Sequence, residues 1–305
     1  MRDNVNQVTS AGAEPSRTDM SNDRPLSCLV GLIGRGILRS KSPEMHEQEA
    51  DAQGIRCLYR LIDLNVLRLG VDALPALLES AERMGFSGVN ITHPCKQAVI
   101  PLLHELSEDA RAIGAVNTVR FRDGKRFGYN TDAAGFAESF RRGLADSPRA
   151  HVVQIGAGGA GAATAYAMLK LGIDRLSLFD AVPARASDLA AKLAKDFGDG
   201  RIAAVHDLPP VMAQADGLVH ATPTGTREHP GLPVPADLLR PELWVAEIVY
   251  FPLETQLMRA ARKLGCRTLD GGGMAVFQAA AAFEIFTGLK ADWDRMLRHF
   301  HTLGG

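Results

Sequence analysis

The feature that most constrains the fold of this chain is a glycine-rich turn, G-x-G-x-x-G, at residues 156–161. Apolar residues 152–155 precede it and an alanine-rich stretch follows, so the turn joins a predicted strand to a predicted helix. The first glycine permits a tight turn, the second lets a pyrophosphate approach, and the third lets helix and strand pack closely. The free N–H groups of the helix N-terminus suit phosphate. The pattern predicts a dinucleotide site; a tight turn without a ligand is the alternative. The predicted cofactor contacts here are Gly156, Ala157, Gly158, Gly159, Ala160 and Gly161.

An acidic residue follows the next predicted strand. Residues 175–179 are mostly apolar and end at Asp180, which lies 24 residues after Gly156. In dinucleotide-binding units a carboxylate about 20 residues after the first glycine accepts hydrogen bonds from the adenosine ribose. The same carboxylate repels the 2′-phosphate of NADP. The sequence therefore favours NAD over NADP, with a purely structural role for Asp180, capping a helix at residues 183–197, as the alternative.

Strands alternate with helices along most of the 305 residues, which predicts an α/β protein with two domains. Polar residues 1–24 have no periodicity and are expected to be a disordered leader. Residues 25–130 are expected to form an N-terminal α/β domain that binds the substrate, completed by C-terminal helices within 274–305. Residues 131–273 are expected to form a doubly wound, Rossmann-type domain that binds the dinucleotide.

Local signals define elements of the first domain. Ser42-Pro43 is expected to open a helix, with Ser42 as its N-cap. A further helix is expected at residues 96–106, and Asp123-Gly124 predicts the turn of a β-hairpin.

Composition excludes several classes of partner. The chain has 34 Lys and Arg against 35 Asp and Glu, a net charge of -1, which disfavours nucleic-acid binding and polybasic attachment to membranes. No apolar stretch approaches the roughly 20 residues that a spanning helix needs. The four cysteines form no C-x-x-C pair, so neither a metal site nor a disulfide framework is expected. We expect a cytoplasmic monomer or homodimer.

Polar clusters follow predicted strands of the first domain. They lie at residues 40–43, at residues 90–96, at Asn117 and at residues 130–132. Open α/β sheets bind ligands at the carboxyl ends of their strands, so these clusters are expected to form one site. Ser, Thr and Asn supply directed hydrogen-bond donors and acceptors without excess charge.

Seven segments, in order, resemble the shikimate dehydrogenase family, and they extend over about residues 29–303. They are GLIG with SKSPEMH (31–46), GVNITHPCK (88–96), GAVNTV (114–119), YNTDAAGF (129–136), GAGGAG (156–161), ATPTG (221–225) and GGGMAVFQAA (271–280). The resemblance implies hydride transfer between a nicotinamide cofactor and a small hydroxylated cyclic carboxylic acid. The nearest branch is that of the NAD-dependent quinate/shikimate dehydrogenases.

The resemblance also implies roles for individual residues. Lys96 and Asp132 would be the catalytic pair. The substrate carboxylate would be held by Ser40 and Ser42, with Tyr250 from the cofactor side, and ring hydroxyls by the remaining polar positions: Asn90, Thr92, Asn117 and Gln278. Further cofactor contacts would be Asp180, Arg185, Thr222 and Gly271. A structural ion pair is the alternative for Lys96 and Asp132.

One departure from the family pattern concerns the cofactor. Biosynthetic members usually carry Asn-Arg-Ser/Thr after the second Rossmann strand, where the arginine holds the 2′-phosphate. This chain has Asp180-Ala181-Val182, and Arg185 alone does not restore that motif. Shikimate is the favoured substrate because a serine stands at position 42, with quinate open. The alternatives are a quinate-preferring or aminoshikimate dehydrogenase and, from another class, a non-catalytic regulatory module that binds the metabolite and NAD.

Overall fold

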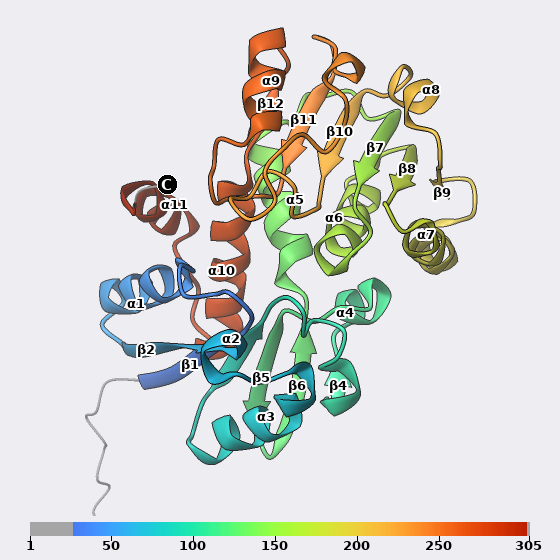
Figure 1. The fold of residues 1–305 in the computed structure, drawn as a ribbon. Coiled ribbons are helices and arrows are strands. Elements are labelled where there is room, and N and C mark those ends of the chain that lie inside the picture. Colours follow the sequence, from blue (N-terminus) through green and yellow to red (C-terminus); the bar gives the residue numbers. More distant parts are fainter. Residues whose placement is uncertain (1–26, 304–305) are drawn as a thin grey trace, which may run out of the picture.

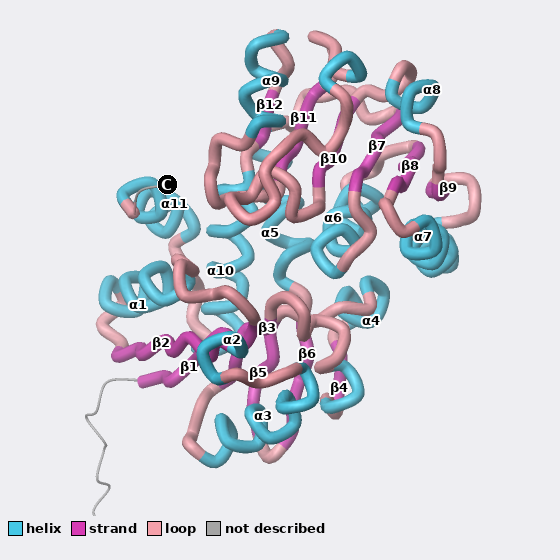
Figure 2. The backbone as a smooth tube through the Cα atoms, in the orientation of Figure 1, coloured by secondary structure: helices cyan, strands magenta, loops and turns pink. Residues whose placement is uncertain are grey.

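The computed structural model describes residues 27–303 and contains two six-stranded sheets, one above the other in Figure 1. The predicted leader, residues 1–24, lies outside the described residues. Helices cover both sheets, and the strands of the two sheets are drawn in magenta in Figure 2. The α/β fold class predicted from the sequence is confirmed.

The first sheet has the strand order β2-β1-β3-β5-β6-β4. The strands are β1 (Ser27–Gly34), β2 (Arg56–Asp63), β3 (Gly88–Ile91), β4 (Glu105–Leu106), β5 (Thr118–Arg122) and β6 (Lys125–Tyr129). Strands β2, β1 and β3 run parallel, whereas β5 is antiparallel to both β3 and β6. The β5–β6 pair is the predicted hairpin, and Asp123 and Gly124 in its turn both have positive φ, of 51° and 70°.

Short helices connect these strands. They are α1 (Ser42–Ala52), α2 (Leu64–Leu67), α3 (Leu74–Arg83), α4 (Glu108–Ile113) and the 3₁₀ turns Val71–Ala73 and Ile100–Leu102. Helix α1 begins at Ser42, so the prediction that Ser42 is its N-cap was wrong. Lys41 is the N-cap, and the Ser40 side chain accepts the Ser42 N–H at 3.2 Å.

The helix predicted at residues 96–106 was also wrong. Turns, the 3₁₀ turn and strand β4 occupy this segment. Pro101 explains the difference, because proline has no N–H to donate and disfavours helical geometry in the residue before it. The main chain instead folds around Lys96, whose carbonyl accepts the Val116 N–H at 2.8 Å.

The second sheet is entirely parallel, with the strand order β12-β11-β10-β7-β8-β9. Its strands are β7 (His151–Ile155), β8 (Arg175–Phe179), β9 (Ile202–Ala204), β10 (Gly217–His220), β11 (Trp244–Glu247) and β12 (Thr268–Leu269). Its helices are α6 (Gly159–Lys170), α7 (Pro183–Phe197), α8 (Leu208–Met212), the 3₁₀ turn Ala236–Leu238 and α9 (Gln256–Leu264). The order reverses at β7, as in a doubly wound fold, so the switch point lies beside the glycine turn.

Three further helices are α5 (Thr131–Gly143), α10 (Gly271–Thr287) and α11 (Trp293–Thr302), of which α11 packs on α1 and α10. Helices α5 and α10 pack against each other and run between the sheets in Figure 1. Their close approach requires Gly135, because a Cβ at that position would lie 2.6 Å from the Gln278 main-chain nitrogen. The sequence analysis did not predict α5, and α10 begins three residues before the predicted 274.

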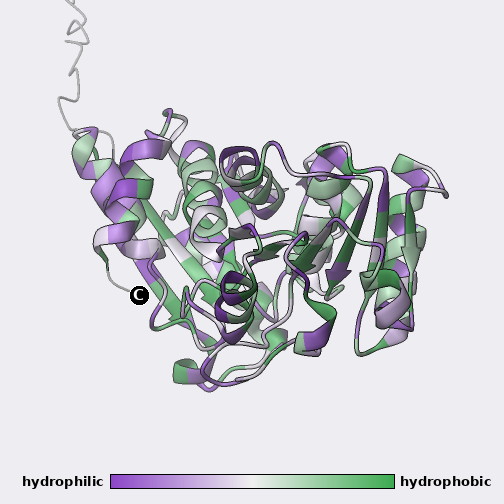
Figure 3. Ribbon diagram, turned by 90° about the horizontal axis from the view of Figure 1, so that it is seen from above, coloured by the Kyte–Doolittle hydropathy of each residue, from purple (hydrophilic) through white to green (hydrophobic). Residues whose placement is uncertain are grey.

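The apolar residues gather in the strands and on the helix faces that cover them, as the green segments of Figure 3 show. The largest buried cluster lies under α5, α6 and α7 and includes Phe136, Phe140 and Trp244. A separate buried cluster packs between α3 and the first sheet. Because each sheet has its own core, the loops at their facing edges are free to form a site.

Candidate functional site

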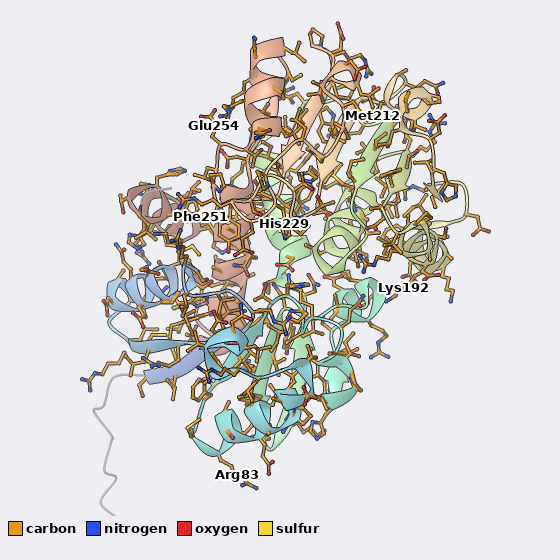
Figure 4. All side chains as sticks on the ribbon, in the orientation of Figure 1. Arg83, Lys192, Met212, His229, Phe251 and Glu254 are labelled. Atoms are coloured by element: carbon orange, nitrogen blue, oxygen red, sulfur yellow. The ribbon has the colours of Figure 1, made fainter. Side chains whose placement is uncertain are left out.

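A cavity of about 390 Å³ lies between the two halves, where loops after β1, β3 and β11 meet the first turns of α5 and α10. Its volume falls in the usual range for small-molecule sites. All nine residues predicted for catalysis and substrate binding line it: Ser40, Ser42, Asn90, Thr92, Lys96, Asn117, Asp132, Tyr250 and Gln278. Phe251, labelled in Figure 4, lines it from the loop after β11.

Lys96 and Asp132 form a shielded ion pair at this cavity. Lys96 Nζ lies 2.5 Å from Asp132 Oδ2, and the side chains are 17% and 8% exposed. Asp132 stands in the first turn of α5, whose N-cap is Asn130. The Asn117 amide nitrogen donates to Asp132 Oδ1 at 2.9 Å, so the carboxylate is held from two sides. The pair can therefore present a proton donor or acceptor to a ligand in a fixed direction.

Asn90 lines the cavity, but its donors are already used. Its amide nitrogen donates to Asn117 O at 3.2 Å and to Thr118 Oγ1 at 2.9 Å. The Tyr59 hydroxyl donates to Asn90 Oδ1 at 2.8 Å, and burial raises the pKa of Tyr59, which keeps that phenol a donor. Asn90 can thus offer a ligand only a remaining lone pair on Oδ1.

The predicted carboxylate end combines hydroxyl groups with cationic side chains. Ser40 Oγ donates to Ser42 Oγ at 3.1 Å, and Tyr250 stands at the mouth with 39% of its surface exposed. Arg35 and Arg39, which the sequence analysis did not select, also line the cavity. Their guanidinium groups create a positive potential that suits an anionic ligand.

The glycine turn adopts the geometry that the motif predicts. Gly156 has a φ of 107°, and a Cβ there would lie 2.4 Å from Ala221 O. A Cβ on Gly161 would lie 2.3 Å from Gly156 O, whereas, among residues 27–303 and apart from the adjoining backbone, no atom lies within 4 Å of the Cβ position of Gly158. The open side at Gly158, the N-cap of α6, is therefore where a pyrophosphate can approach the backbone.

A buried glutamine supports this turn, and the sequence analysis missed it. Gln154 Nε2 donates to Gly156 O at 2.8 Å and to Gly161 O at 2.7 Å. Thr164 Oγ1 donates to Gln154 Oε1 at 2.9 Å. A polar residue in the otherwise apolar run 152–155 was the available signal.

Most of the predicted cofactor residues lie at the glycine turn or at the cavity, but Arg185 does not. Asp180 Oδ2 accepts the Ala157 N–H and its Oδ1 accepts the Val182 N–H, both at 2.8 Å. Ala160 and Gly271 line the cavity, and a Cβ on Gly159 would lie 3.5 Å from Lys96 Cδ, so the glycine turn adjoins the ion pair. Thr222 packs beside Gly156. Arg185 is exposed on α7, and within residues 27–303 its side chain makes no hydrogen bond or ion pair.

Two further searches covered the described part of the chain. Residues 27–303 contain no group of three His, Cys, Asp or Glu side chains placed to hold a metal ion. In the same residues no helix is both long enough and apolar enough to cross a bilayer.

Comparisons with known proteins agree with this architecture. Residues 32–119 match the model of the shikimate dehydrogenase substrate binding domain, and residues 271–299 that of the shikimate 5'-dehydrogenase C-terminal domain. A shikimate dehydrogenase (NADP(+)) of Streptomyces avermitilis is 57% identical over 92% of this chain and 97% of its own length. A quinate/shikimate dehydrogenase (NAD(+)) of Corynebacterium efficiens is 47% identical over 91% of this chain and 99% of its own. The structure of quinate dehydrogenase from Corynebacterium glutamicum in complex with NAD matches with a TM-score of 0.84 and 45% identity, covering 90% and 99% of the two chains.

The fold and the site together define a two-domain α/β protein of the nicotinamide-dinucleotide oxidoreductase class, with a polar cavity beside the glycine turn. Within that class, the chain belongs to the shikimate dehydrogenase family.

Proposed function

We propose that this protein is an NAD-dependent dehydrogenase that interconverts shikimate and 3-dehydroshikimate, and that it also accepts quinate. The observation that carries the proposal is the Lys96–Asp132 pair, which lines the cavity and adjoins the glycine turn through Gly159. A module that only binds metabolite and NAD has no need of a shielded proton-transfer pair at the point where the two ligands would meet. We also propose that the two domains are residues 25–130 with 274–305 and residues 131–273.

In this proposal the ion pair manages the proton that accompanies hydride transfer. NAD supplies the hydride acceptor at its nicotinamide ring. Oxidation of the alcohol requires the deprotonated form of the Lys96 amine, which accepts the hydroxyl proton and so regenerates the ion pair with Asp132; during reduction, the ammonium of the ion pair donates a proton to the carbonyl oxygen. Asp132 holds the Lys96 nitrogen in place at 2.5 Å, and Asn117 fixes the carboxylate in turn.

The carboxylate of the substrate is proposed to bind at Ser40, Ser42 and Tyr250, with Arg35 and Arg39 adding positive potential. Its ring hydroxyls are proposed to bind Thr92, Gln278, Asn90 and Asn117. The donors of Asn90 are occupied by protein groups, so at that position we propose acceptance of a hydroxyl proton by Oδ1. An amide that can only accept favours a hydroxyl over an oxygen that lacks a proton.

NAD preference is proposed from the acidic residue after β8. The Asp180 carboxylate is bonded to the Ala157 N–H of the glycine turn, which supports a position at the adenosine ribose. A negative charge there disfavours a 2′-phosphate, and Ala181 supplies no guanidinium to bind one. Gly156, Gly158 and Gly161 are proposed to hold the pyrophosphate side, Thr222 and Gly271 the nicotinamide side, and Arg185 the outer edge of the adenosine site.

A quinate preference is a second candidate, because the Corynebacterium relatives at 45–47% identity carry quinate in their names. Quinate and shikimate differ at the ring carbon that bears the carboxylate, which is the end proposed to face Ser40 and Ser42. A cytoplasmic location is also proposed, since all four cysteines are free thiols.

Steady-state kinetics test the proposed activity and cofactor preference. Shikimate and quinate are each assayed with NAD and with NADP, and the four kcat/KM values are compared. We expect the highest value for shikimate with NAD. A higher value with NADP would contradict the role of Asp180, and a higher value for quinate would establish the second candidate. If neither acid is oxidised with either dinucleotide, the proposed function is wrong.

A further inference from the structure

A buried histidine and glutamate lie together at the carboxyl edge of the second sheet, outside the cavity. His220 ends β10 and Glu247 ends β11, and the parallel register pairs the two residues. His220 Nδ1 lies 2.8 Å from Glu247 Oε1 and 3.0 Å from Oε2, and neither side chain is exposed. Removing such groups from water is unfavourable unless every polar atom finds a partner. The hydrogen-bond partners of His220 and Glu247 therefore show which segments of the chain the pair fixes in place.

The glutamate end holds the loop that leads to the cavity mouth. Glu247 Oε1 accepts the Val249 N–H at 3.0 Å, and Oε2 accepts the Thr255 hydroxyl at 3.1 Å. Thr255 Oγ1 in turn accepts the Met258 N–H at the start of α9. Tyr250 lies within the segment between these anchors, so the pair fixes the main chain on both sides of a cavity residue.

The histidine end holds the loop beside the glycine turn. His220 Nε2 lies 2.5 Å from Thr222 Oγ1, and Thr222 Oγ1 accepts the Thr224 N–H at 3.2 Å. The His220 ring therefore links the two partners, with Nδ1 at the Glu247 carboxylate and Nε2 at the Thr222 hydroxyl. The Thr222 methyl group would meet a Cβ on Gly156 at 2.9 Å, so the threonine packs directly against the first glycine.

We propose that the His220–Glu247 pair is a positioning element that sets Thr222 and residues 221–225 against the glycine turn, and so sets the binding of the nicotinamide half of the dinucleotide. The inference rests on the proposed function, because it takes a nicotinamide dinucleotide as the ligand of this turn. His220 acts through Thr222 and does not itself line the cavity.

The test separates positioning from plain structural support. In His220→Asn, the amide nitrogen replaces Nδ1 and still donates to Glu247, but the side chain is too short to reach Thr222. His151→Asn is the matched control. His151 is also buried, with its Nε2 2.9 Å from Ser177 Oγ. It is the first residue of β7, so it lies at the amino ends of the strands, whereas His220 lies at their carboxyl ends. Thr222→Val removes the same contact from the other side and carries the test if His220→Asn does not fold.

Binding of NAD is measured by titration calorimetry without the acid, and KM and kcat are measured for both substrates. We expect His220→Asn and Thr222→Val each to raise the NAD dissociation constant about tenfold, equivalent to about 1.4 kcal/mol. The KM for the acid should stay within twofold, the double variant should be no weaker than either single one, and His151→Asn should bind NAD as the wild type does.

Two results would overturn the inference. One is NAD binding by both His220→Asn and Thr222→Val within twofold of wild type, whatever stability they lose. The other is additive losses in the double variant, which would show that the two side chains act separately. Failure of the proposed function looks different, because the wild-type protein itself would then fail to bind NAD or to oxidise either acid.

Discussion

The buried histidine of α1 should make the stability of this protein fall steeply in mild acid. His46 is 1% exposed, its Nε2 has no hydrogen-bond partner within residues 27–303, and its ring lies 4.9 Å from that of Tyr59. Burial lowers the pKa of His46 from 6.5 to about 3, because the imidazolium would have to exist among aromatic rings. Below pH 6.5, His46 therefore binds a proton in the unfolded chain but stays neutral in the folded chain. The free energy of unfolding is at its full value above pH 6.5 and falls as the pH decreases from 6.5 toward 3.

The size of the effect follows from linkage. Each pH unit between the two pKa values lowers the free energy of unfolding by about 1.4 kcal/mol, so the loss from pH 8 to pH 5 is about 2 kcal/mol from this residue alone. Urea unfolding followed by circular dichroism, at pH 8 and pH 5 and constant ionic strength, measures it. His46→Leu removes the titrating group while keeping an apolar side chain, so its loss should be smaller than that of the wild type by about 2 kcal/mol.

The difference between wild type and variant cancels the titration of all other groups. His206→Leu, at an exposed position, is the control for the loss of a histidine as such and should follow the wild-type profile. Equal losses in wild type and His46→Leu would refute the reasoning, because they would mean that His46 binds a proton as readily in the folded chain as in the unfolded one.

Three further predictions concern the site and the helices that frame it. Lys96→Ala should lower kcat at least a hundredfold, while calorimetry should find NAD binding within twofold of wild type; near-normal turnover would remove Lys96 from its proposed role. Asp180→Ala should raise the ratio of kcat/KM for NADP to that for NAD at least tenfold, and an unchanged ratio would argue against the ribose contact. Gly135→Ala should lower the free energy of unfolding by about 1–3 kcal/mol, because its Cβ would lie 2.6 Å from the Gln278 nitrogen, and an unchanged urea midpoint would show that α5 and α10 can separate freely.

Much of this site could be predicted because its residues follow strands in short, characteristic segments. The clusters at residues 40–43 and 90–96 follow β1 and β3, which are neighbours in the sheet, and residues of both clusters line the same cavity. The glycine turn was likewise predicted with its flanking strand, residues 151–155. In both cases the signal is local, and the parallel sheet brings the local pieces to one edge.

Errors arose where a local signal was misread or overlooked. The predicted helix at residues 96–106 contains Pro101, and proline disfavours a helix there even though the apolar residues around it have helical periodicity. Helix α5 was missed although Asn130 provides an N-cap signal and Phe136 and Phe140 have helical spacing. The buried face of α5 packs on α10, more than a hundred residues later, so the partner that stabilises it is not visible nearby.

The His220–Glu247 pair could not have been predicted from spacing. The two residues are 27 positions apart, and they meet only because β10 and β11 are neighbours with His220 in register with Glu247. Strand order and register are properties of the assembled sheet. The available signal was weaker, namely that two apolar strands each end in a residue able to carry a charge.

The cofactor preference depends on few positions, which is why overall similarity is a poor guide to it. Relatives at 57% and 47% identity are named for NADP(+) and NAD(+), respectively, so identity over the whole chain does not sort the two preferences. The two carboxylate oxygens of Asp180 accept the main-chain N–H groups of Ala157 and Val182. The carboxylate therefore cannot move away from its position without breaking these hydrogen bonds. The proposed preference for NAD therefore rests on the negative charge of Asp180 and on the absence of a guanidinium at position 181, and not on overall identity.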